Sequence, residues 1–585
     1  MKYFANRYYK KFYPLFTALL AFWGLTAALT FISAGSNGGH FVYALDDPYI
    51  HMSMAKNFVN SGVWGITPAE FTSSSSSPLW TLLLSGVYYI TGVNEIAPFV
   101  LNIIFASLAL LAAFLFLRKY INNSLIITGA LLSVVFFGAL TQVVFTGLEH
   151  TLQTFLTVLA FYFLSDLLEK GRTFCRPGRT FLYKDYMFLY ITLAALSAVR
   201  YEGLFVSIAV IFVLGYRRKY IAALLTLLFA ALPAVVMGII SVSKGWYFLP
   251  NPVLLKGAGM QTGFISLLFS VFSFRFAVNL WDYYYVLIII VLLLIFFFLL
   301  LRGEKKEKSG TEKTGLLTDN ASCVKEQPKQ NSAVLFPMIF VLITAALLHA
   351  QFAKFGSLLR YDLYLAAPGI LLTVISAVKY FSVHTQKKVL QFRIPEKVLL
   401  TLVLAVSLIP FVFISIRGVR NIPRASSNIY NMQYQTAQFV KEYYNDNIVA
   451  LNDIGAVAFY SDARCIDLWG IANLEVAAAI KEGKYNTDKI NELAVMPNAK
   501  IAFVFEKWFD KYGGLPQRWK KAGEWTIPDN IACGDERVSI YAVDKFNYNK
   551  LLRALNAFSG KLPAVVKQSG EYLKPPPPIK TDPHQ

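Results

Sequence analysis

The sequence is short of charge, cysteine and histidine, and each shortage excludes a class of protein. Only 15% of the 585 residues are charged and 56% are hydrophobic, whereas about a quarter of the residues in a soluble protein are charged. Together with a mean hydropathy of +0.48, this excludes an ordinary cytosolic enzyme and a disordered chain. Four cysteines are too few for a disulfide-stapled secreted domain. The composition predicts a polytopic membrane protein with room for a soluble domain.

Acidic residues are also scarce, with 35 Asp and Glu against 55 Lys and Arg, for a net charge of +20. A nucleic-acid-binding protein and a membrane protein with basic cytoplasmic loops both produce such an excess, so its position decides. Residues 1–416 hold 33 basic and 17 acidic residues, whereas residues 417–585 hold 22 and 18. The excess therefore belongs to the apolar part of the chain, and no nucleic-acid partner is predicted.

Eleven segments are apolar and long enough, or nearly so, to cross a bilayer, which takes about 20 residues of helix. They are 13–34, 95–117, 124–144, 151–168, 186–199, 204–216, 220–242, 282–301, 333–351, 363–382 and 398–416. Two further stretches are ambiguous, because 79–92 is brief and 264–281 is interrupted by Arg275. Counting both as spans gives thirteen.

Basic residues favour eleven spans over thirteen. Lys2, Arg7, Lys10 and Lys11 precede the first span and place the N-terminus in the cytoplasm, because cytoplasmic flanks are enriched in Lys and Arg. With eleven spans, 26 of the 33 basic residues in 1–416 fall on the cytoplasmic side and 7 fall outside. With thirteen spans, the basic loops between residues 118 and 219 would lie outside. The first span lacks a small-residue cleavage site, which indicates a retained anchor.

The pattern changes after residue 416, where short β-type runs alternate with helical stretches such as Tyr434–Tyr444. The runs are Ile448–Leu451, Ile501–Phe505 and Val538–Val543. They predict an extracytoplasmic α/β domain over 417–573, followed by a proline-rich tail over 574–585. Cys465 and Cys533 fall in this domain, and the sequence leaves open whether they form a disulfide or remain two thiols.

Several short segments with ionisable or unusual residues share the predicted outer side. They are Asp46–Ile50, Ser73–Trp80, Thr146–His150, Arg200–Gly203, Leu249–Pro252 with Lys256, Arg360–Asp362 and Asn452–Gly455. Ionisable groups at membrane depth are costly and tend to mark function. Such a ring of acids and bases suits a site that handles a charged, lipid-linked molecule.

Asp46 and Asp47 are the most informative pair in these segments. Pro48 suits the first position of a helix, so Asp47 is placed where an N-cap belongs. Asp46 is not needed by that cap. Adjacent carboxylates raise each other's proton affinity, which suits one of them to act as a general base. The sequence leaves both interpretations of the pair open.

The other outer acids and bases allow two interpretations each. Glu149 and Glu202 either cap helices or pair with Arg200. Lys256 and Arg360 are either interfacial anchors with a snorkelling head group or ligands of a phosphate.

Three further residues are candidates for contact with a sugar or an acceptor. Asn251 lies between two prolines and marks a rigid turn. Trp80 either stacks on a sugar or belongs to an interfacial aromatic belt. Asp453 either binds the acceptor or occupies a structural turn after a strand.

In this order, the segments resemble the polytopic, lipid-phosphate-dependent glycosyltransferases of the GT-C class, and most of all the branch of the terminal arabinofuranosyltransferase (AftB). The residues that match this branch are Asp46 to Ile50, Ser77 to Trp80, Gly147 to Glu149, Arg200 with Glu202 and Gly203, Pro250 with Asn251 and Lys256, Arg360 with Tyr361, Asp453 with Gly455, and Asp467 with Leu468 and Gly470. Tyr201 departs from the pattern, because the branch has proline at that place.

The resemblance implies a GT-C-like module in a bacterial plasma membrane, with its active site on the extracytoplasmic side. A polyprenyl-phosphate-linked sugar would be the donor, and a glycan, a lipid or another cell-envelope component the acceptor, in an inverting transfer. Asp46, with Asp47 beside it, would be the general base. The residues that bind the donor phosphate would be Lys256, Arg200 and Arg360. The residues that orient the sugar or the acceptor would be Glu149, Glu202, Asn251, Trp80 and Asp453.

A monophosphate donor creates no strong need for a metal, although the acidic pair leaves room for a divalent cation. No Cys or His cluster indicates zinc.

Two other classes of function remain open. A transporter or flippase of lipid-linked sugars would also be polytopic, but transporters tend to show internal repeats with broken spans at matching positions, and no such repeat is evident here. A non-catalytic, glycan-binding membrane protein would leave the Asp46–Asp47 pair unexplained.

Overall fold

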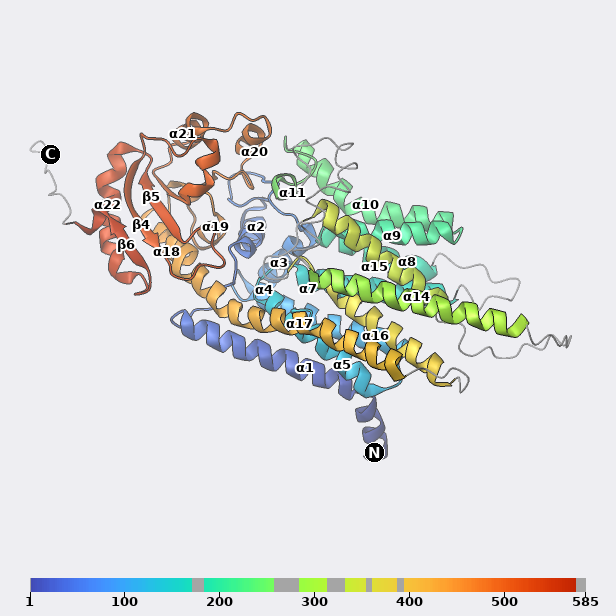
Figure 1. Cartoon of the computed structure of the whole chain (residues 1–585). Helices are drawn as coiled ribbons and strands as arrows, with labels where there is room; N and C mark the ends of the chain where they lie inside the picture. The colour runs from blue at the N-terminus through green and yellow to red at the C-terminus, as the bar shows by residue number, and fades with distance from the viewer. Residues whose placement is uncertain are drawn as a thin grey trace, which may run out of the picture.

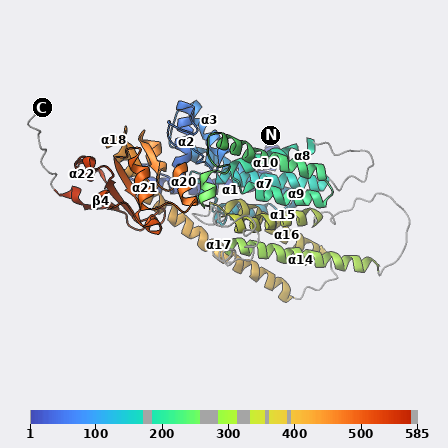
Figure 2. The ribbon, with the colours of Figure 1, turned by 90° about the horizontal axis from the view of Figure 1, so that it is seen from above.

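The computed structural model describes residues 2–170, 184–256, 284–312, 332–353, 360–386 and 394–574. In these residues the chain forms a long helical bundle with a sheet domain at one end (Figure 1). The view turned by 90° shows the same end-to-end arrangement (Figure 2). The ambiguous stretch 264–281 and the tail beyond Lys574 lie outside the described residues.

The helices of the bundle follow the predicted spans. Their bounds are α1 Lys2–Ser36, α4 Ala97–Tyr120, α5 Ser124–Phe136, α7 His150–Lys170, α8 Lys184–Val199, α9 Gly203–Tyr216, α10 Tyr220–Ser243, α14 Tyr284–Glu312, α15 Ser332–Phe352, α16 Leu363–Gln386 and α17 Ile394–Ile429. Eight helices in the described part of the chain are long and apolar enough to cross a membrane, and α5, α8 and α9 are shorter apolar helices. The prediction of a polytopic helical protein is confirmed.

Four shorter helices lie between the bundle helices in the sequence: α2 Asp47–Ser61, α3 Pro78–Thr91, α6 Leu140–Val144 and α11 Asn251–Lys256. Prolines occupy the first turn of α2 and α3, where the missing N–H has no helical partner to lose. The ambiguous stretch 79–92 forms α3, whose 14 residues are too few for a full span of about 20.

The C-terminal domain is a mixed six-stranded sheet with strand order β2-β1-β3-β5-β4-β6. Its strands are β1 Ile448–Leu451, β2 Arg464–Asp467, β3 Ile501–Val504, β4 Lys520–Thr526, β5 Arg537–Ala542 and β6 Lys567–Gly570. Strand β1 pairs in parallel with β2 and β3, and the remaining pairs are antiparallel. The predicted C-terminal α/β domain is confirmed.

Helices cover both faces of this sheet. Side chains of α20 Leu474–Lys481 and α21 Thr487–Val495 share a core with Ala450 and Ala502 of the sheet. Side chains of α18 Gln435–Tyr443, α19 Gly455–Tyr460 and α22 Tyr548–Phe558 share the other core with Val449 and Phe503. Because successive strand residues face opposite sides, one short buried strand serves both cores.

Helix α17 does not end where the domain limit was predicted. It runs through residue 416 to Ile429, continues as the π-helix Tyr430–Tyr434, and passes directly into α18. A continuous helical rod therefore joins the bundle to the sheet domain, as Figure 1 shows.

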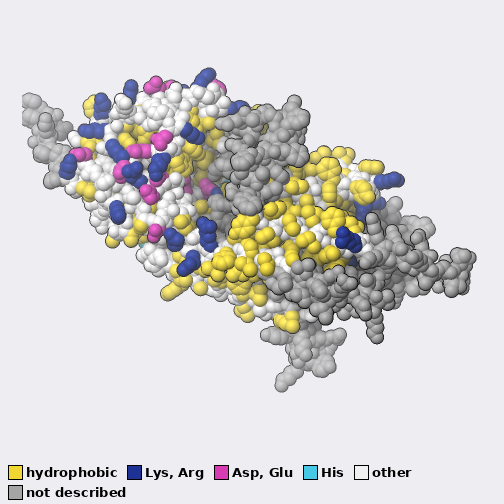
Figure 3. Space-filling model, in the orientation of Figure 1, with side chains coloured by type: hydrophobic (Ala, Val, Ile, Leu, Met, Phe, Trp, Pro, Cys, Tyr) yellow, Lys and Arg dark blue, Asp and Glu magenta, His cyan; other side chains and the backbone are white. Residues whose placement is uncertain are grey.

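The surface reflects the two parts. In Figure 3, apolar side chains cover much of the visible face of the bundle, and acidic and basic side chains are mixed over the sheet domain. Cys465 and Cys533 are free thiols in this domain.

Candidate active site

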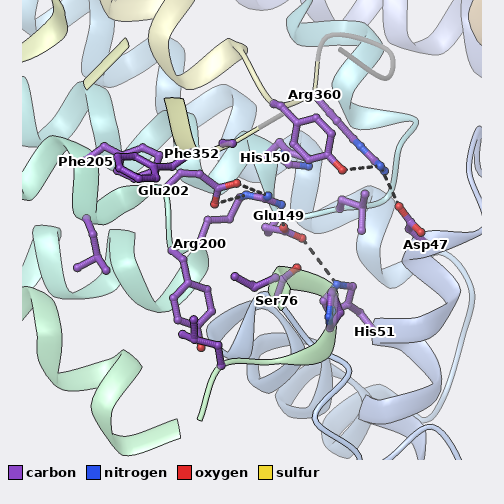
Figure 4. A pocket seen from close by; sticks show the side chains of 18 of the residues that line it. Asp47, His51, Ser76, Glu149, His150, Arg200, Glu202, Phe205, Phe352 and Arg360 are labelled. Carbon is purple, nitrogen blue, oxygen red and sulfur yellow. Dashed lines mark hydrogen bonds and ion pairs between the residues drawn. The ribbon is translucent and has the colours of Figure 1, made fainter. Parts of the chain in front are cut away.

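A cavity of about 570 Å³ lies at the junction of the bundle and the sheet domain. The helices α2, α9 and α11 and the C-terminal end of α15 contribute to its walls. The segments that precede α3, α7, α9 and α16 contribute the rest of the bundle side. Ile471 of the sheet domain completes the lining. Five predicted site residues line this cavity: Asp47, Glu149, Arg200, Glu202 and Arg360. Figure 4 shows their side chains grouped around it.

Asp47 is the first residue of α2, so its predicted position as the N-cap is wrong by one residue; the N-cap is Asp46, whose side chain makes no capping bond to α2. The carboxylate of Asp47 pairs instead with Arg360, at 2.9 Å between Oδ2 and Nη2. About 30% of the Asp47 side chain is exposed. Among the pair predicted as general base, Asp47 is the residue that faces the cavity.

Asp46 points away from this cavity and toward the sheet domain. Its Oδ2 accepts a hydrogen bond from the N–H of Gly455 at 2.6 Å, and its Oδ1 accepts one from the N–H of Ala456 at 2.8 Å. Both donors lie in the first turn of α19, where N–H groups have no helical acceptor. Asp46 thus supplies from α2 the cap that α19 lacks from its own sequence.

Asp453 lies beside Asp46 in a separate, small cavity of about 20 Å³. Its Oδ2 accepts a hydrogen bond from the side chain of Gln433 at 2.7 Å. Burial raises the pKa of Asp46, and the neighbouring Asp453 raises it further, against the opposing effect of the two backbone N–H groups. These two carboxyl groups form part of the contact between the bundle and the sheet domain.

Arg200 is held between two carboxylates. Its Nη1 lies 2.6 Å from Oε1 of Glu149, its Nη2 lies 2.6 Å from Oε1 of Glu202, and its Nε donates to Oε2 of Glu202 at 3.1 Å. The Arg200 side chain is 11% exposed and that of Glu149 is 1% exposed. This cluster of one cation and two anions has a net negative charge, so Arg200 does not offer an uncompensated positive charge to a ligand. Oε2 of Glu149 is buried and has no hydrogen-bond partner among the described residues.

Arg360 has donors left over. Its Nη2 serves Asp47 and also donates to the hydroxyl of Tyr361 at 2.7 Å. Its Nε and Nη1 are buried without a hydrogen-bond partner in the described part of the chain. The ring of Tyr361 lies under both guanidinium groups, 4.6 Å from Arg360 and 5.1 Å from Arg200, an arrangement that stabilises cations. Since buried donors normally find an acceptor, the two remaining Arg360 donors indicate a site for an anionic ligand.

Two histidines that were not predicted as site residues, His51 and His150, also line the cavity. His51 lies with Nδ1 3.0 Å from the hydroxyl of Thr81 and with Nε2 4.0 Å from Oε2 of Glu149. His150 packs its ring edge against Tyr361 at 5.4 Å between centroids. His51 comes four residues after Asp47, so helical spacing alone places both on one face of α2 and predicts its approach to the site.

One wall of the cavity is apolar. Helix α9 contributes Leu204, Phe205 and Ile208, and α15 contributes Phe352. Figure 4 shows Phe205 and Phe352 side by side, on the side of the cavity away from Asp47. The cavity therefore has a polar end between α2 and Arg360 and an apolar end between two bundle helices.

The remaining predicted residues lie elsewhere. Asn251 begins α11 and is fully buried, and its side chain donates to the carbonyl of Gly470 at 2.8 Å, which links the bundle to the sheet domain. Trp80 is fully buried near Phe105 and does not line the cavity. Lys256 is the last residue of α11, and its side chain lies outside the described part of the structure.

Within the ranges that the structure describes, no group of three or more His, Cys, Asp or Glu side chains is placed to hold a metal ion. Asp46 and Asp47, the acidic pair suggested for a cation, point to different cavities.

Comparisons with known proteins give a partial family match and several structural likenesses. A family model described as a domain of unknown function (DUF8728) matches residues 427–541, which run from the end of α17 to β5. No curated protein sequence matches the chain.

Three solved structures are similar to this one. ArnT from Cupriavidus metallidurans bound to undecaprenyl phosphate is 10% identical with a TM-score of 0.48, over 90% of this chain and 98% of that chain. The Archaeoglobus fulgidus oligosaccharyltransferase in the apo form is 15% identical with a TM-score of 0.47, over 92% of this chain and 75% of that chain. The oligosaccharyltransferase AglB of Archaeoglobus fulgidus, in complex with an inhibitory peptide and a dolichol-phosphate, is 13% identical with a TM-score of 0.46 over the same shares.

Proposed function

We propose that this protein is a membrane glycosyltransferase that transfers a sugar from a polyprenyl-phosphate donor to an extracytoplasmic acceptor. The observation that supports this most directly is the two-ended cavity. Its polar end gathers acids and guanidinium groups, and its apolar end is lined by side chains of α9 and α15. A volume of about 570 Å³ is in the usual range of sites for small ligands, and the two ends match the head and the chain of a lipid-linked sugar.

The donor phosphate is assigned to Arg360. Its two unpartnered donors, Nε and Nη1, are buried, and each can donate one charge-assisted hydrogen bond to a phosphate oxygen. Lys256 is a second candidate, because Pro252 and Val253 of the same short helix line the cavity. Arg200, already engaged by Glu149 and Glu202, holds these two acids in place and does not bind the phosphate itself.

The prenyl chain would follow the apolar wall. Phe205 and Ile208 of α9 and Phe352 of α15 lie on the bundle side of the cavity, so a chain that leaves the phosphate in this direction stays in contact with apolar side chains. Because lipid tails are as apolar as these side chains, the wall would contribute van der Waals packing and not a transfer from water.

Asp47 is assigned as the general base. In the proposed step it takes the proton of an acceptor hydroxyl while that oxygen forms a bond to the anomeric carbon. The bond from this carbon to the phosphate oxygen breaks on the opposite face, and the phosphate leaves with the electron pair, which gives inversion. Arg360 pairs with Asp47 and therefore fixes its carboxylate, while its remaining donors stabilise the charge on the leaving phosphate.

Glu149 and Tyr201 are assigned to the sugar. Oε2 of Glu149 and the hydroxyl of Tyr201 line the cavity region without a hydrogen-bond partner among the described residues, so both can bond to sugar hydroxyls. An arabinofuranosyl donor is the first to test, because the resemblance stated above points to it. Tyr201 is the residue in which this chain departs from that branch.

The remaining assignments complete the proposal. The N-terminus is cytoplasmic and the sheet domain extracytoplasmic, in a bacterial plasma membrane, so the acceptor reaches the cavity from the side of Ile471. Asp46, Asp453 and Asn251 hold the sheet domain in place over the site and act as positioning residues. Trp80 supports α3 from within the bundle.

The test is sugar transfer by the purified full-length protein in lipid nanodiscs, with synthetic polyprenyl-phosphate sugars as donors. Asp47→Asn is expected to lower turnover by about 10²–10⁴-fold, which is the usual contribution of a general base. Asp488→Asn makes the same change on the exposed surface of α21 and is expected to retain activity.

Three outcomes contradict the proposal in different ways. Full activity of Asp47→Asn removes the base assignment. Donor binding without transfer to any acceptor favours a glycan-binding protein, and passage of the intact lipid-linked sugar across a vesicle bilayer favours a flippase.

A further inference from the structure

A second, open cavity of about 960 Å³ lies between the end of α1 and the second half of α17. Leu29 and Ile32 of α1 form one wall, and Phe413, Ile416 and Val419 of α17 form the other. Ile531 of the sheet domain also lines it. We call this cavity the α1–α17 groove. About half or more of each of the side chains Ile32, Phe413 and Ile416 is exposed, at 51%, 67% and 52%.

Three arginines line the α1–α17 groove. Arg417, Arg420 and Arg424 follow one another at spacings of three and four residues, so they lie on one face of α17 over two helical turns. All three are exposed, and no Asp or Glu is among the described residues that line the groove. In Figure 3, basic side chains are visible where the apolar surface of the bundle meets the sheet domain, over the region that α17 occupies in Figure 1.

This position is unusual for basic residues. In the proposed topology, the outer side receives only 7 of the 33 Lys and Arg residues of 1–416, because basic residues normally stay on the cytoplasmic side. Three arginines at the outer end of the last span run against that tendency. Binding of an anionic ligand by these three arginines gives a physical reason for their position on the outer side.

We propose that the α1–α17 groove binds the phosphate head group of an anionic phospholipid from the outer leaflet. Guanidinium groups form paired hydrogen bonds with phosphate oxygens. Arg417 and Arg424 are about 10 Å apart along the helix, so the three arginines together reach across a head-group layer, which is about 5–7 Å thick on each side of a bilayer. The exposed apolar side chains below them would contact the acyl chains, which is why the occupant is a lipid and not a free phosphate ion. This site is separate from the candidate active site and does not depend on the function proposed for it.

The experiment is native mass spectrometry of the full-length protein, titrated in detergent with phosphatidylglycerol or with phosphatidylcholine. Wild type is expected to retain phosphatidylglycerol in preference to phosphatidylcholine. Each basic residue near a membrane surface favours anionic lipid by about fivefold. The double variant Arg420→Gln with Arg424→Gln is therefore expected to weaken phosphatidylglycerol retention by about 25-fold. Replacing the same two residues by Lys keeps the charge but loses the paired hydrogen bonds, and an intermediate loss is expected.

The matched control is Arg518→Gln with Arg553→Gln, which removes two exposed charges from the sheet domain and is expected to bind lipid as wild type does. Equal retention of the two lipids by wild type overturns the proposal, as does unchanged retention by the Arg420 and Arg424 variant. An equal loss of phosphatidylglycerol retention in the control would show that net charge, and not the groove, causes the effect, and it would also overturn the proposal. Displacement of the lipid by inorganic phosphate at equal concentration identifies free phosphate, and not lipid, as the ligand. Melting temperatures of all variants identify any loss that comes from misfolding.

Discussion

Replacing Gly455 by alanine is expected to separate the sheet domain from α2. A Cβ atom at this position would lie 2.3 Å from the backbone oxygen of Asp46 and 2.6 Å from its Oδ2. An ordinary contact between a carbon and an oxygen is about 3.3–3.6 Å, so one partner has to move by roughly 1 Å. Because the obstruction includes backbone, a side-chain rotation does not relieve it.

The cost follows from the hydrogen bonds that this movement breaks. Asp46 accepts from the N–H groups of Gly455 and Ala456 at 2.6 Å and 2.8 Å, and both bonds lengthen beyond hydrogen-bond range after a 1 Å displacement. Hydrogen bonds to a carboxyl group contribute about 1–3 kcal/mol each, so the contact loses about 2–6 kcal/mol. Local opening of α19 then becomes about 30-fold to 10⁴-fold more frequent.

Hydrogen exchange of the full-length protein in nanodiscs measures this opening. The peptide that contains residues 452–460 is expected to lose protection by that factor in Gly455→Ala, while peptides from the central strand β3 exchange as in wild type. Gly560→Ala is the matched control, because its Cβ meets no atom within 4 Å. Unchanged protection at 452–460 in Gly455→Ala would refute the structural role assigned to Asp46.

Two further predictions concern a cation and an acid. Arg360→Lys keeps a positive charge near Asp47 but removes the donors Nε and Nη1. The KM for the donor is expected to rise by about 10–100-fold with a smaller change in kcat, because a hydrogen bond to a charged group contributes about 1.5–3 kcal/mol. Steady-state kinetics measures both constants, and an unchanged KM speaks against phosphate binding by Arg360. Burial raises the pKa of Asp467 to about 6, against the opposing hydrogen bonds from the backbone of Ala472 and Trp469. The folded state therefore holds this proton more tightly than the unfolded state, and its stabilising contribution, up to about 3 kcal/mol, is present below about pH 4 and is lost as the pH rises toward 6. Thermal unfolding of full-length Asp467→Asn is expected to lack this part of the pH dependence, and an identical pH profile in both proteins would contradict it.

The membrane part of the fold was predictable because burial in lipid requires long apolar helices. Each of the eleven predicted segments overlaps a helix. In the sheet domain, β1, β3 and β5 were predicted from their apolar runs. The strands β2, β4 and β6 were missed because none of them contains a run of apolar residues, and β4 is interrupted by a bulge between Lys521 and Gly523. Their pairing partners, and not their own composition, make them strands.

The site was predictable as a set of segments but not in its internal geometry. The sequence indicated that Asp46 and Asp47 matter, yet adjacency gave no reason to prefer either. The distinction depends on Gly455, which is more than 400 positions away and turns Asp46 toward the sheet domain. Arg200 was predicted as a phosphate ligand, and pairing of Glu149 and Glu202 with Arg200 was one of two interpretations left open. The structure shows both ion pairs, and nothing in the sequence favoured them because the two acids come from separate segments.

Because α17, the π-helix and α18 form one rod, the chain between residues 416 and 435 fixes both the distance and the rotation between the bundle and the sheet domain. Each residue in a helix turns the structure by about 100° and advances it by 1.5 Å. Inserting a single residue there would rotate the sheet domain by about a quarter of a turn relative to the bundle, and the contacts of Asp46 with Gly455 and of Asn251 with Gly470 could not both persist. A chimaera that carries the sheet domain of a related protein therefore has to keep the number of residues in the rod. Each added or removed residue changes the distance and the rotation between the two parts together.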